Sequence, residues 1–148
     1  MKFLIINGPN LNFLGIREPG IYGKQDFTAL IAYVETVCAE NGIDCETYQS
    51  NHEGDIVDRI QAAYGNTDGI VINPAAYTHT SVAIPDAIKA VSIPTVEVHL
   101  SDISAREAFR KISYVSPVAV KTIYGKGFTG YQEAILYLKT LLADNGRK

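Results

Sequence analysis

The residues best suited to chemistry gather in three short polar segments of the chain. These segments are residues 7–12 (NGPNLN), 73–79 (NPAAYTH) and 97–101 (EVHLS), and each lies at the end of an apolar run. They hold two of the three histidines, His79 and His99. Because an imidazole gains and loses a proton near neutral pH, this pattern points to acid–base chemistry.

Glu97 and His99 form the most informative pair. They are two residues apart, so on a strand both side chains point to the same face. A carboxylate there would orient the imidazole and favour its protonated form, which suits His99 to donate a proton. A single histidine is more often structural, but the strand-end position, the carboxylate and the nearby Asn73 favour a functional one. His52, in a stretch typical of a helix start, is expected on the surface.

Residues 8–24 show no clear helix or strand, and a loop of that length in a small domain is often a lid. From residue type alone, Tyr22 in this loop could be a surface aromatic, but Arg17 lies nearby. A free tyrosine has a pKa of about 10, and lowering that pKa to about 8 requires about 2.7 kcal/mol. A guanidinium about 4 Å away supplies energy of that order near a protein surface. Tyr22 is therefore a candidate base that Arg17 would activate.

A cationic stretch follows the third polar segment, over residues 101–111 (SDISAREAFRK). Asp102 or Ser104 could cap a short helix there, which would place Arg106 and Arg110 on one helix face. Such a face is commonly just solvated. Because the stretch directly follows a predicted strand, an arginine could instead reach a cleft and bind an anionic substrate.

The periodicity of the apolar residues predicts strands that alternate with helices. The predicted strands cover residues 2–7, 45–49, 68–73, 95–99 and 118–124. The predicted helices cover an apolar stripe from Phe27 to Cys38 that stops near Gly42, and then residues 56–63, 81–91 and 131–142. This alternation predicts a single α/β domain over residues 1–148: a flavodoxin-like, doubly wound, five-stranded parallel sheet of order 2-1-3-4-5 with helices on both faces. In that order strands one, three and four are neighbours, so the polar segments meet in one cleft.

Composition and motifs argue against several classes of function. The net charge is -3 and the basic residues are scattered, which disfavours nucleic acid as a partner. No stretch resembles a signal peptide or a membrane span. We interpret Cys38 and Cys45 as small buried hydrophobic residues of a cytoplasmic protein, and no metal site is apparent. Residues 125–130 (GKGFTG) match GxGxxG, but no strand with an acidic residue follows, so we expect a tight turn rather than a dinucleotide site.

Several longer words of the sequence resemble those of the type II 3-dehydroquinate dehydratases. They are NGPNLN, REPxxYG (17–23), NPAAYTHTSVAIPDA (73–87), EVHLSD (97–102) and AREAFRKxSY (105–114), in this order and nearly end to end. The resemblance implies a flavodoxin-like hydro-lyase without cofactor or metal, assembled through trimers into a dodecamer. The implied reaction dehydrates 3-dehydroquinate to 3-dehydroshikimate, in the shikimate pathway of aromatic amino acid biosynthesis or in quinate breakdown.

The resemblance also implies roles in an anti elimination through an enolate. Tyr22 would remove the proton from the carbon beside the substrate ketone, and Arg17 would hold Tyr22 in its reactive, low-pKa state. Asn10 would stabilise the enolate through a bound water, as an oxyanion donor does. His99 would then protonate the departing hydroxyl.

The same resemblance implies contacts that bind and position the substrate. Asn73 and Glu97 would position His99 and the ligand. The substrate carboxylate would lie on the backbone amides of Leu100 and Ser101.

His79 and Arg110 would bind the substrate hydroxyls, Arg106 would belong to the lid, and Asp86 would reach the site of a neighbouring subunit. Taken without the resemblance, the residues leave two alternatives open. One is a hydrolase or transferase of the same fold that acts on a small polar acid. The other is a non-enzymatic protein that binds a small ligand, which would have no use for a low-pKa tyrosine.

Overall fold

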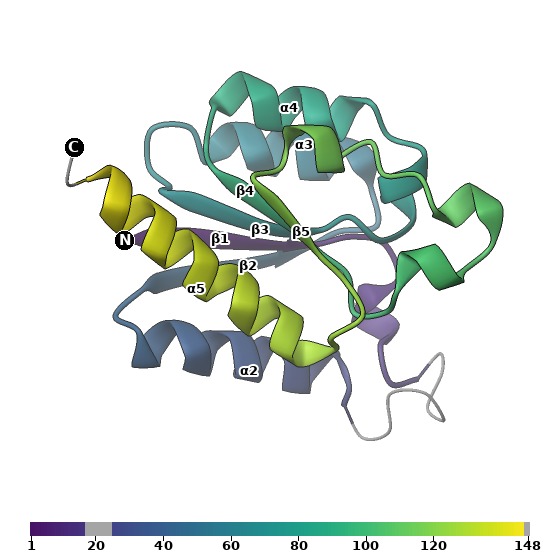
Figure 1. Ribbon diagram of the computed structural model, residues 1–148, viewed down its shortest axis with the longest axis horizontal. Coiled ribbons are helices and arrows are strands. Elements are labelled where there is room, and N and C mark those ends of the chain that lie inside the picture. The colour runs from purple at the N-terminus through teal and green to yellow at the C-terminus, as the bar shows by residue number, and fades with distance from the viewer. Residues whose placement is uncertain (17–24, 147–148) are drawn as a thin grey trace.

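The computed structural model describes residues 1–16 and 25–146. Its centre is a parallel sheet of five strands in the order β2-β1-β3-β4-β5 (Figure 1). The strands are β1 (Lys2–Asn7), β2 (Asp44–Gln49), β3 (Gly69–Asn73), β4 (Thr95–Val98) and β5 (Lys121–Ile123). The predicted strand order is confirmed.

Helices cover both faces of the sheet (Figure 1). One face carries α2 (Phe27–Glu40) and α5 (Phe128–Asn145), and the other carries α3 (Glu53–Ala62) and α4 (Ala83–Val91). Side chains of β1 alternate between the two layers: Phe3 and Ile5 join the core beside α2 and α5, whereas Leu4 and Ile6 join the core beside α3 and α4. A strand that is buried on both sides has few polar positions, which explains the continuous apolar run of β1.

Local signals set where α2 begins and ends. The Asp26 side chain caps the helix by accepting a hydrogen bond of 2.8 Å from the Ala29 N–H. Beyond the helix, Gly42 has a φ of 67°, a left-handed conformation that favours glycine, and the chain turns there into β2. The helix predicted from the apolar stripe is thus confirmed. Cys38 in α2 is buried as predicted, whereas Cys45 in β2 is half-buried, and both are free thiols.

The sequence suggested a short helix within residues 101–111, capped by Asp102 or Ser104, with Arg106 and Arg110 on one face; Asp102 does cap a turn, but no single helix holds both arginines. The stretch forms two separate turns of 3-10 helix, η3 (Ile103–Ala105) and η4 (Ala108–Arg110). Asp102 accepts hydrogen bonds from both the N–H and the hydroxyl of Ser104, which fixes one tight turn at the start. Arg106 then takes an extended conformation, with φ -95° and ψ -173°, so the helix cannot continue.

The strand predicted over residues 118–124 is shorter than expected. A further turn, η5 (Ser116–Val118), takes up the start of that stretch, and Pro117 lies in its first turn, where a missing N–H is tolerated. After β5, Gly125 and Gly127 have φ values of 79° and 56°. The GxGxxG segment is therefore a tight turn that leads into α5, as predicted.

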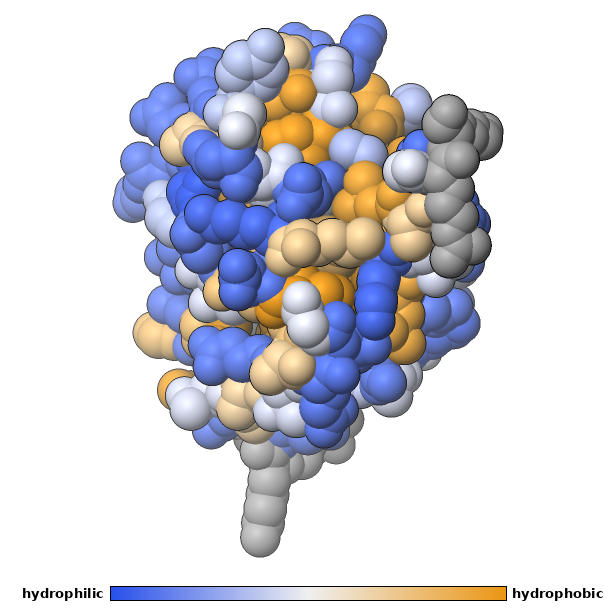
Figure 2. All heavy atoms as spheres, turned by 90° about the vertical axis from the view of Figure 1, so that its left-hand side faces the viewer, coloured by the Kyte–Doolittle hydropathy of each residue, from blue (hydrophilic) through white to orange (hydrophobic). Residues whose placement is uncertain are grey.

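The two ends of the sheet differ in character. The end at which the strands begin shows a patch of apolar side chains within hydrophilic surroundings (Figure 2). At the opposite end, η1 (Leu11–Phe13) and η2 (Ala75–His79) follow β1 and β3. Over the residues described, no helix combines the length and the apolar character needed to cross a bilayer.

Candidate active site

A cavity of about 230 Å³ lies beyond the carboxyl ends of β1, β3 and β4, where this fold class binds ligands. The segments that follow these strands form its walls, together with the turn-rich stretch after β4. Eight of the predicted site residues line it: Asn10, Asn73, His79, His99, Leu100, Ser101, Arg106 and Arg110. The structure therefore brings the three polar segments together.

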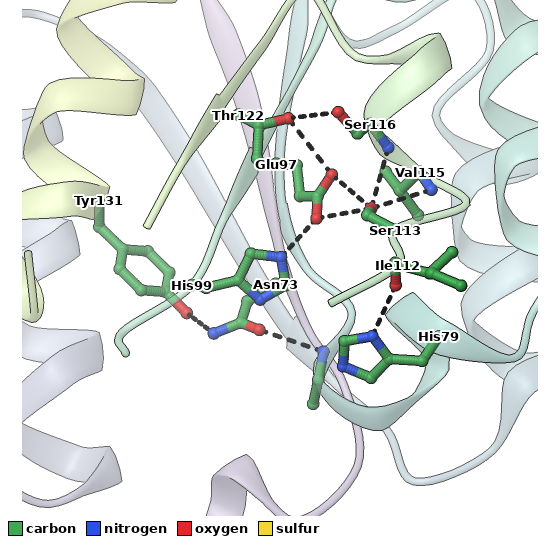
Figure 3. A network of polar contacts seen from close by, with 11 residues as sticks. Asn73, His79, Glu97, His99, Ile112, Ser113, Val115, Ser116, Thr122 and Tyr131 are labelled. Carbon is green, nitrogen blue, oxygen red and sulfur yellow. Dashed lines mark hydrogen bonds and ion pairs between the residues drawn. The ribbon is translucent and has the colours of Figure 1, made fainter. Parts of the chain in front are cut away.

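His99 forms a hydrogen bond to Glu97 through Nε2 (Figure 3). Glu97 lies on β4 and is fully buried, and His99, just past the end of that strand, is 5% exposed. A carboxylate removed from water requires hydrogen-bond donors. Because an ionised carboxylate can only accept, the proton of this bond belongs to Nε2, and Nδ1 is the nitrogen left to serve the cavity.

Glu97 has two further neighbours that the sequence did not suggest. Ser113 Oγ lies 2.9 Å from both carboxylate oxygens, and Thr122 Oγ1 lies 3.4 Å from one of them (Figure 3). Ser113 falls within the AREAFRKxSY stretch, but its sequence position does not indicate which residue it contacts. Ser113 and Thr122 lie 16 and 25 residues from Glu97 in the sequence, so these contacts can be seen only in the folded chain.

Asn73 is fixed through both ends of its amide. Its Nδ2 donates to the Tyr131 hydroxyl at 3.0 Å, and its Oδ1 accepts from the Ala75 N–H at 3.1 Å. Tyr131 in turn donates to Asn7 Oδ1 at 2.6 Å. Burial raises the pKa of Tyr131 above its ordinary value, so the phenol keeps its proton and remains a donor. The sequence predicted Tyr131 only as part of an apolar helix face, and its link to Asn73 was missed.

The loop after β1 is held in a shape that presents Asn10 to the cavity. Gly8 N–H donates to the Asn73 carbonyl at 2.8 Å, and a Cβ on Gly8 would lie 2.4 Å from the Pro74 carbonyl oxygen, so only glycine fits. Asn10 itself has a φ of 69°, a left-handed conformation that asparagine tolerates. Its N–H donates to Asn51 Oδ1 at 3.0 Å, which anchors the loop to the segment after β2.

His79 and the two arginines, Arg106 and Arg110, also line the cavity. His79 Nδ1 lies 2.7 Å from the Ile112 carbonyl, and since a carbonyl only accepts, Nδ1 is protonated and Nε2 can accept when the ring is neutral. Arg110 Nε forms an ion pair of 2.8 Å with Glu107. A hydrogen bond with its own backbone, together with the guanidiniums of Arg110 and Arg106, holds the pKa of Glu107 below its ordinary value.

Comparison with known proteins identifies the family. Residues 1–139 match the family model described as dehydroquinase class II. The chain belongs to the class II dehydroquinase family. The 3-dehydroquinate dehydratase of Clostridium acetobutylicum is 52% identical over 97% of this chain and 99% of its own. The catabolic 3-dehydroquinase of Aspergillus oryzae is 58% identical over 90% of this chain and 88% of its own.

A solved structure supports the same family. The type II dehydroquinase from Butyrivibrio crossotus superposes with a TM-score of 0.91 at 55% identity, covering 94% of this chain and 97% of that one. This class II dehydroquinase is accordingly an enzyme, a hydro-lyase, of flavodoxin-like fold. In the described ranges, no three side chains from His, Cys, Asp and Glu come together as metal ligands would.

Three predicted residues are not seen with the others in this dehydroquinase. Arg17 and Tyr22 lie outside the described residues. Leu14 and Gly15, the residues just before that segment, line the cavity. Asp86 is exposed in the first turn of α4 and is not part of the cavity wall of its own chain.

Proposed function

We propose that this chain converts 3-dehydroquinate to 3-dehydroshikimate by an anti elimination of water through an enolate. The observation that carries the proposal is the buried Glu97–His99 pair, whose His99 lines the cavity at the carboxyl edge of the sheet. Family membership supplies the substrate, because relatives of the chain are named 3-dehydroquinate dehydratase.

The first step removes a proton from the carbon beside the ketone. Tyr22 is the base, and the positive charge of Arg17 lowers its pKa from the ordinary value of about 10. The enolate oxygen then requires a donor, and a water bound by Asn10 supplies it. The anchored loop around Asn10 supports this role, because a donor that is already in place does not have to reorganise during the reaction.

The second step expels the hydroxyl as water, and His99 is the acid. Glu97 accepts the Nε2–H of His99 and stabilises the imidazolium, so that Nδ1 can release its proton to the leaving group. Asn73, which is 3% exposed and fixed by Tyr131, positions His99 and the ligand from the neighbouring strand end.

The substrate carboxylate binds at the turn after β4. The Leu100 carbonyl accepts from the Gly127 N–H at 3.0 Å, and the Ser101 carbonyl accepts from the Gly125 N–H at 3.1 Å, which fixes this backbone. Within the described residues, the amides of Leu100 and Ser101 donate no backbone hydrogen bond of their own. Two fixed N–H groups of this kind suit a carboxylate.

Side chains around this turn complete the binding site. His79 accepts from a substrate hydroxyl through Nε2, Arg110 donates to another hydroxyl, and Arg106 belongs to the lid. Asp86, exposed on α4, reaches the site of a neighbouring subunit in a dodecamer built from trimers. The site requires no cofactor or metal, and the enzyme works in the cytoplasm.

Absorbance tests the function directly. Dehydration creates a conjugated enone, so ultraviolet absorbance will rise when 3-dehydroquinate is added to the purified protein. His99→Ala is the control and should slow the rise. A hydrolase or transferase for another small acid, or a protein that merely binds ligands, would give no rise, and that result would end the proposal.

A further inference from the structure

The hydrogen-bond partners of the Ser113 hydroxyl determine where its proton points. Its oxygen accepts from the Val115 N–H at 3.2 Å and from the Ser116 N–H at 3.0 Å. A hydroxyl has two lone pairs and one proton. With both lone pairs occupied by backbone donors, Ser113 can only donate in its third contact, and that contact is Glu97.

Thr122 does not share this constraint. Its Oγ1 lies 3.1 Å from Ser116 Oγ and 3.4 Å from Glu97 Oε1, and one proton cannot serve both partners. Ser113 therefore donates to the buried Glu97 carboxylate whichever way the Thr122 and Ser116 hydroxyl protons point. His99 is the other close partner of that carboxylate.

We propose that Ser113 is a positioning residue of the reaction, which acts on His99 through Glu97. The obligatory donation from Ser113 stabilises the ionised carboxylate, and an ionised carboxylate must accept from His99 Nε2. When the ring is positively charged, its second proton is then on Nδ1, the nitrogen that protonates the leaving hydroxyl. This role rests on the proposed function, because it matters only if His99 is the acid.

A purely structural role for Ser113 would predict something different. The same hydroxyl holds the turn of residues 113–116, so Ser113→Ala removes the turn contacts and the donation together. Ser113→Asn and Ser113→Asp separate the two roles. Both have a side-chain oxygen that can accept from the Val115 and Ser116 amides, but asparagine always carries N–H donors for Glu97, whereas an ionised aspartate carries none. Ser113 lines a second cavity that is open to solvent, which gives the larger side chains room.

The two variants are compared by nitrogen NMR of labelled histidine without substrate, and by steady-state kinetics on 3-dehydroquinate. With asparagine, His99 should keep the signal of a ring that is protonated at Nε2, and kcat should stay close to wild type. With aspartate, that signal should be lost and kcat should fall by about tenfold or more, since general acid catalysis contributes about 10²–10⁴-fold. KM should change little in either variant, because Ser113 does not line the substrate cavity.

Equal kcat values and equal His99 spectra for the two variants would overturn the proposal, since Ser113 would then serve only the turn. A folding check by circular dichroism accompanies each variant. The NMR result does not depend on the substrate. If the protein did not dehydrate 3-dehydroquinate but the His99 signal still differed between the variants, the effect of Ser113 on His99 through Glu97 would be supported. Only its role in dehydration would be refuted.

Discussion

At the scale of single residues, this site depends on which atom already holds a proton. The Glu97 carboxylate can only accept, so it fixes a proton on Nε2 of His99. The Ile112 carbonyl likewise fixes a proton on Nδ1 of His79. Both rings donate through one nitrogen, but their partners differ in charge. The Glu97 carboxylate favours a positively charged ring, which suits the proposed role of His99 as a proton donor from Nδ1, whereas the neutral Ile112 carbonyl suits His79 to accept at Nε2.

Tyr22→Phe tests the base. The change removes only the hydroxyl, so turnover should be abolished while binding of the ligand remains largely intact. Absorbance measures the turnover, and titration calorimetry with 3-dehydroquinate measures the binding. Near-normal turnover in this variant would leave Tyr22 without a role.

Arg17→Ala tests the electrostatic account of that base. Without the guanidinium, the lowered pKa of Tyr22 should rise toward the ordinary tyrosine value of about 10. The reactive phenolate would then form only at higher pH, so the acidic side of the rate profile should move upward in pH. Arg17→Lys is the matched control, because it keeps the charge and should restore much of the profile. An unchanged rate and profile in Arg17→Ala would contradict the account.

At the scale of elements, the site depends on side chains that connect helix α5 to the ends of strands β1 and β3. Tyr131 of α5 bonds to Asn7 at the end of β1 and to Asn73 at the end of β3, so the closing helix fixes two adjacent strand ends. The register supports this, since Asn7 and Asn73 are direct neighbours in the sheet. A helix that contributes nothing to the cavity wall therefore determines how Asn73 is presented.

Tyr131→Phe should reduce the free energy of unfolding and lower kcat. The change leaves buried amide groups of Asn7 and Asn73 without their partner, and each such group costs about 1–3 kcal/mol. Tyr33→Phe is the control: Tyr33 donates to Gln132 at an exposed position, so its loss should cost within about 0.5 kcal/mol. Urea unfolding of both variants measures the difference. Equal stability would show that the Tyr131 hydroxyl is not required.

At the scale of the whole molecule, the features that could be predicted from the sequence are those set by short-range patterns of apolar and polar residues. Strand order followed from the alternation of periods, and the Glu97–His99 contact followed from a spacing of two on one strand. The Asp102 cap was suggested correctly, but the short helix that would place Arg106 and Arg110 on one face does not form, because Arg106 takes an extended conformation that the spacing of the arginines does not reveal. Ser113 and Tyr131 were missed since their partners lie 16 and 58 residues away, and only the completed sheet brings them together.

Assembly is the last level at which the site can be tested. Asp86 is exposed on α4, outside the cavity of its own chain, which is the geometry expected if it serves a neighbour. His99, by contrast, belongs to the cavity of its own chain. If both statements hold, a complete site combines residues from two chains, and two different inactive variants can repair each other.

Asp86→Ala and His99→Ala should therefore be refolded together in equal amounts. A site is complete when its own chain keeps His99 and the neighbour that contacts it keeps Asp86, which random assembly gives in about one quarter of the sites. Activity measured by absorbance should return to about that fraction of wild type, while each variant refolded alone stays low. If Asp86 acted within its own chain, every site in the mixture would lack one of the two residues. No activity would return, and the shared site would be ruled out.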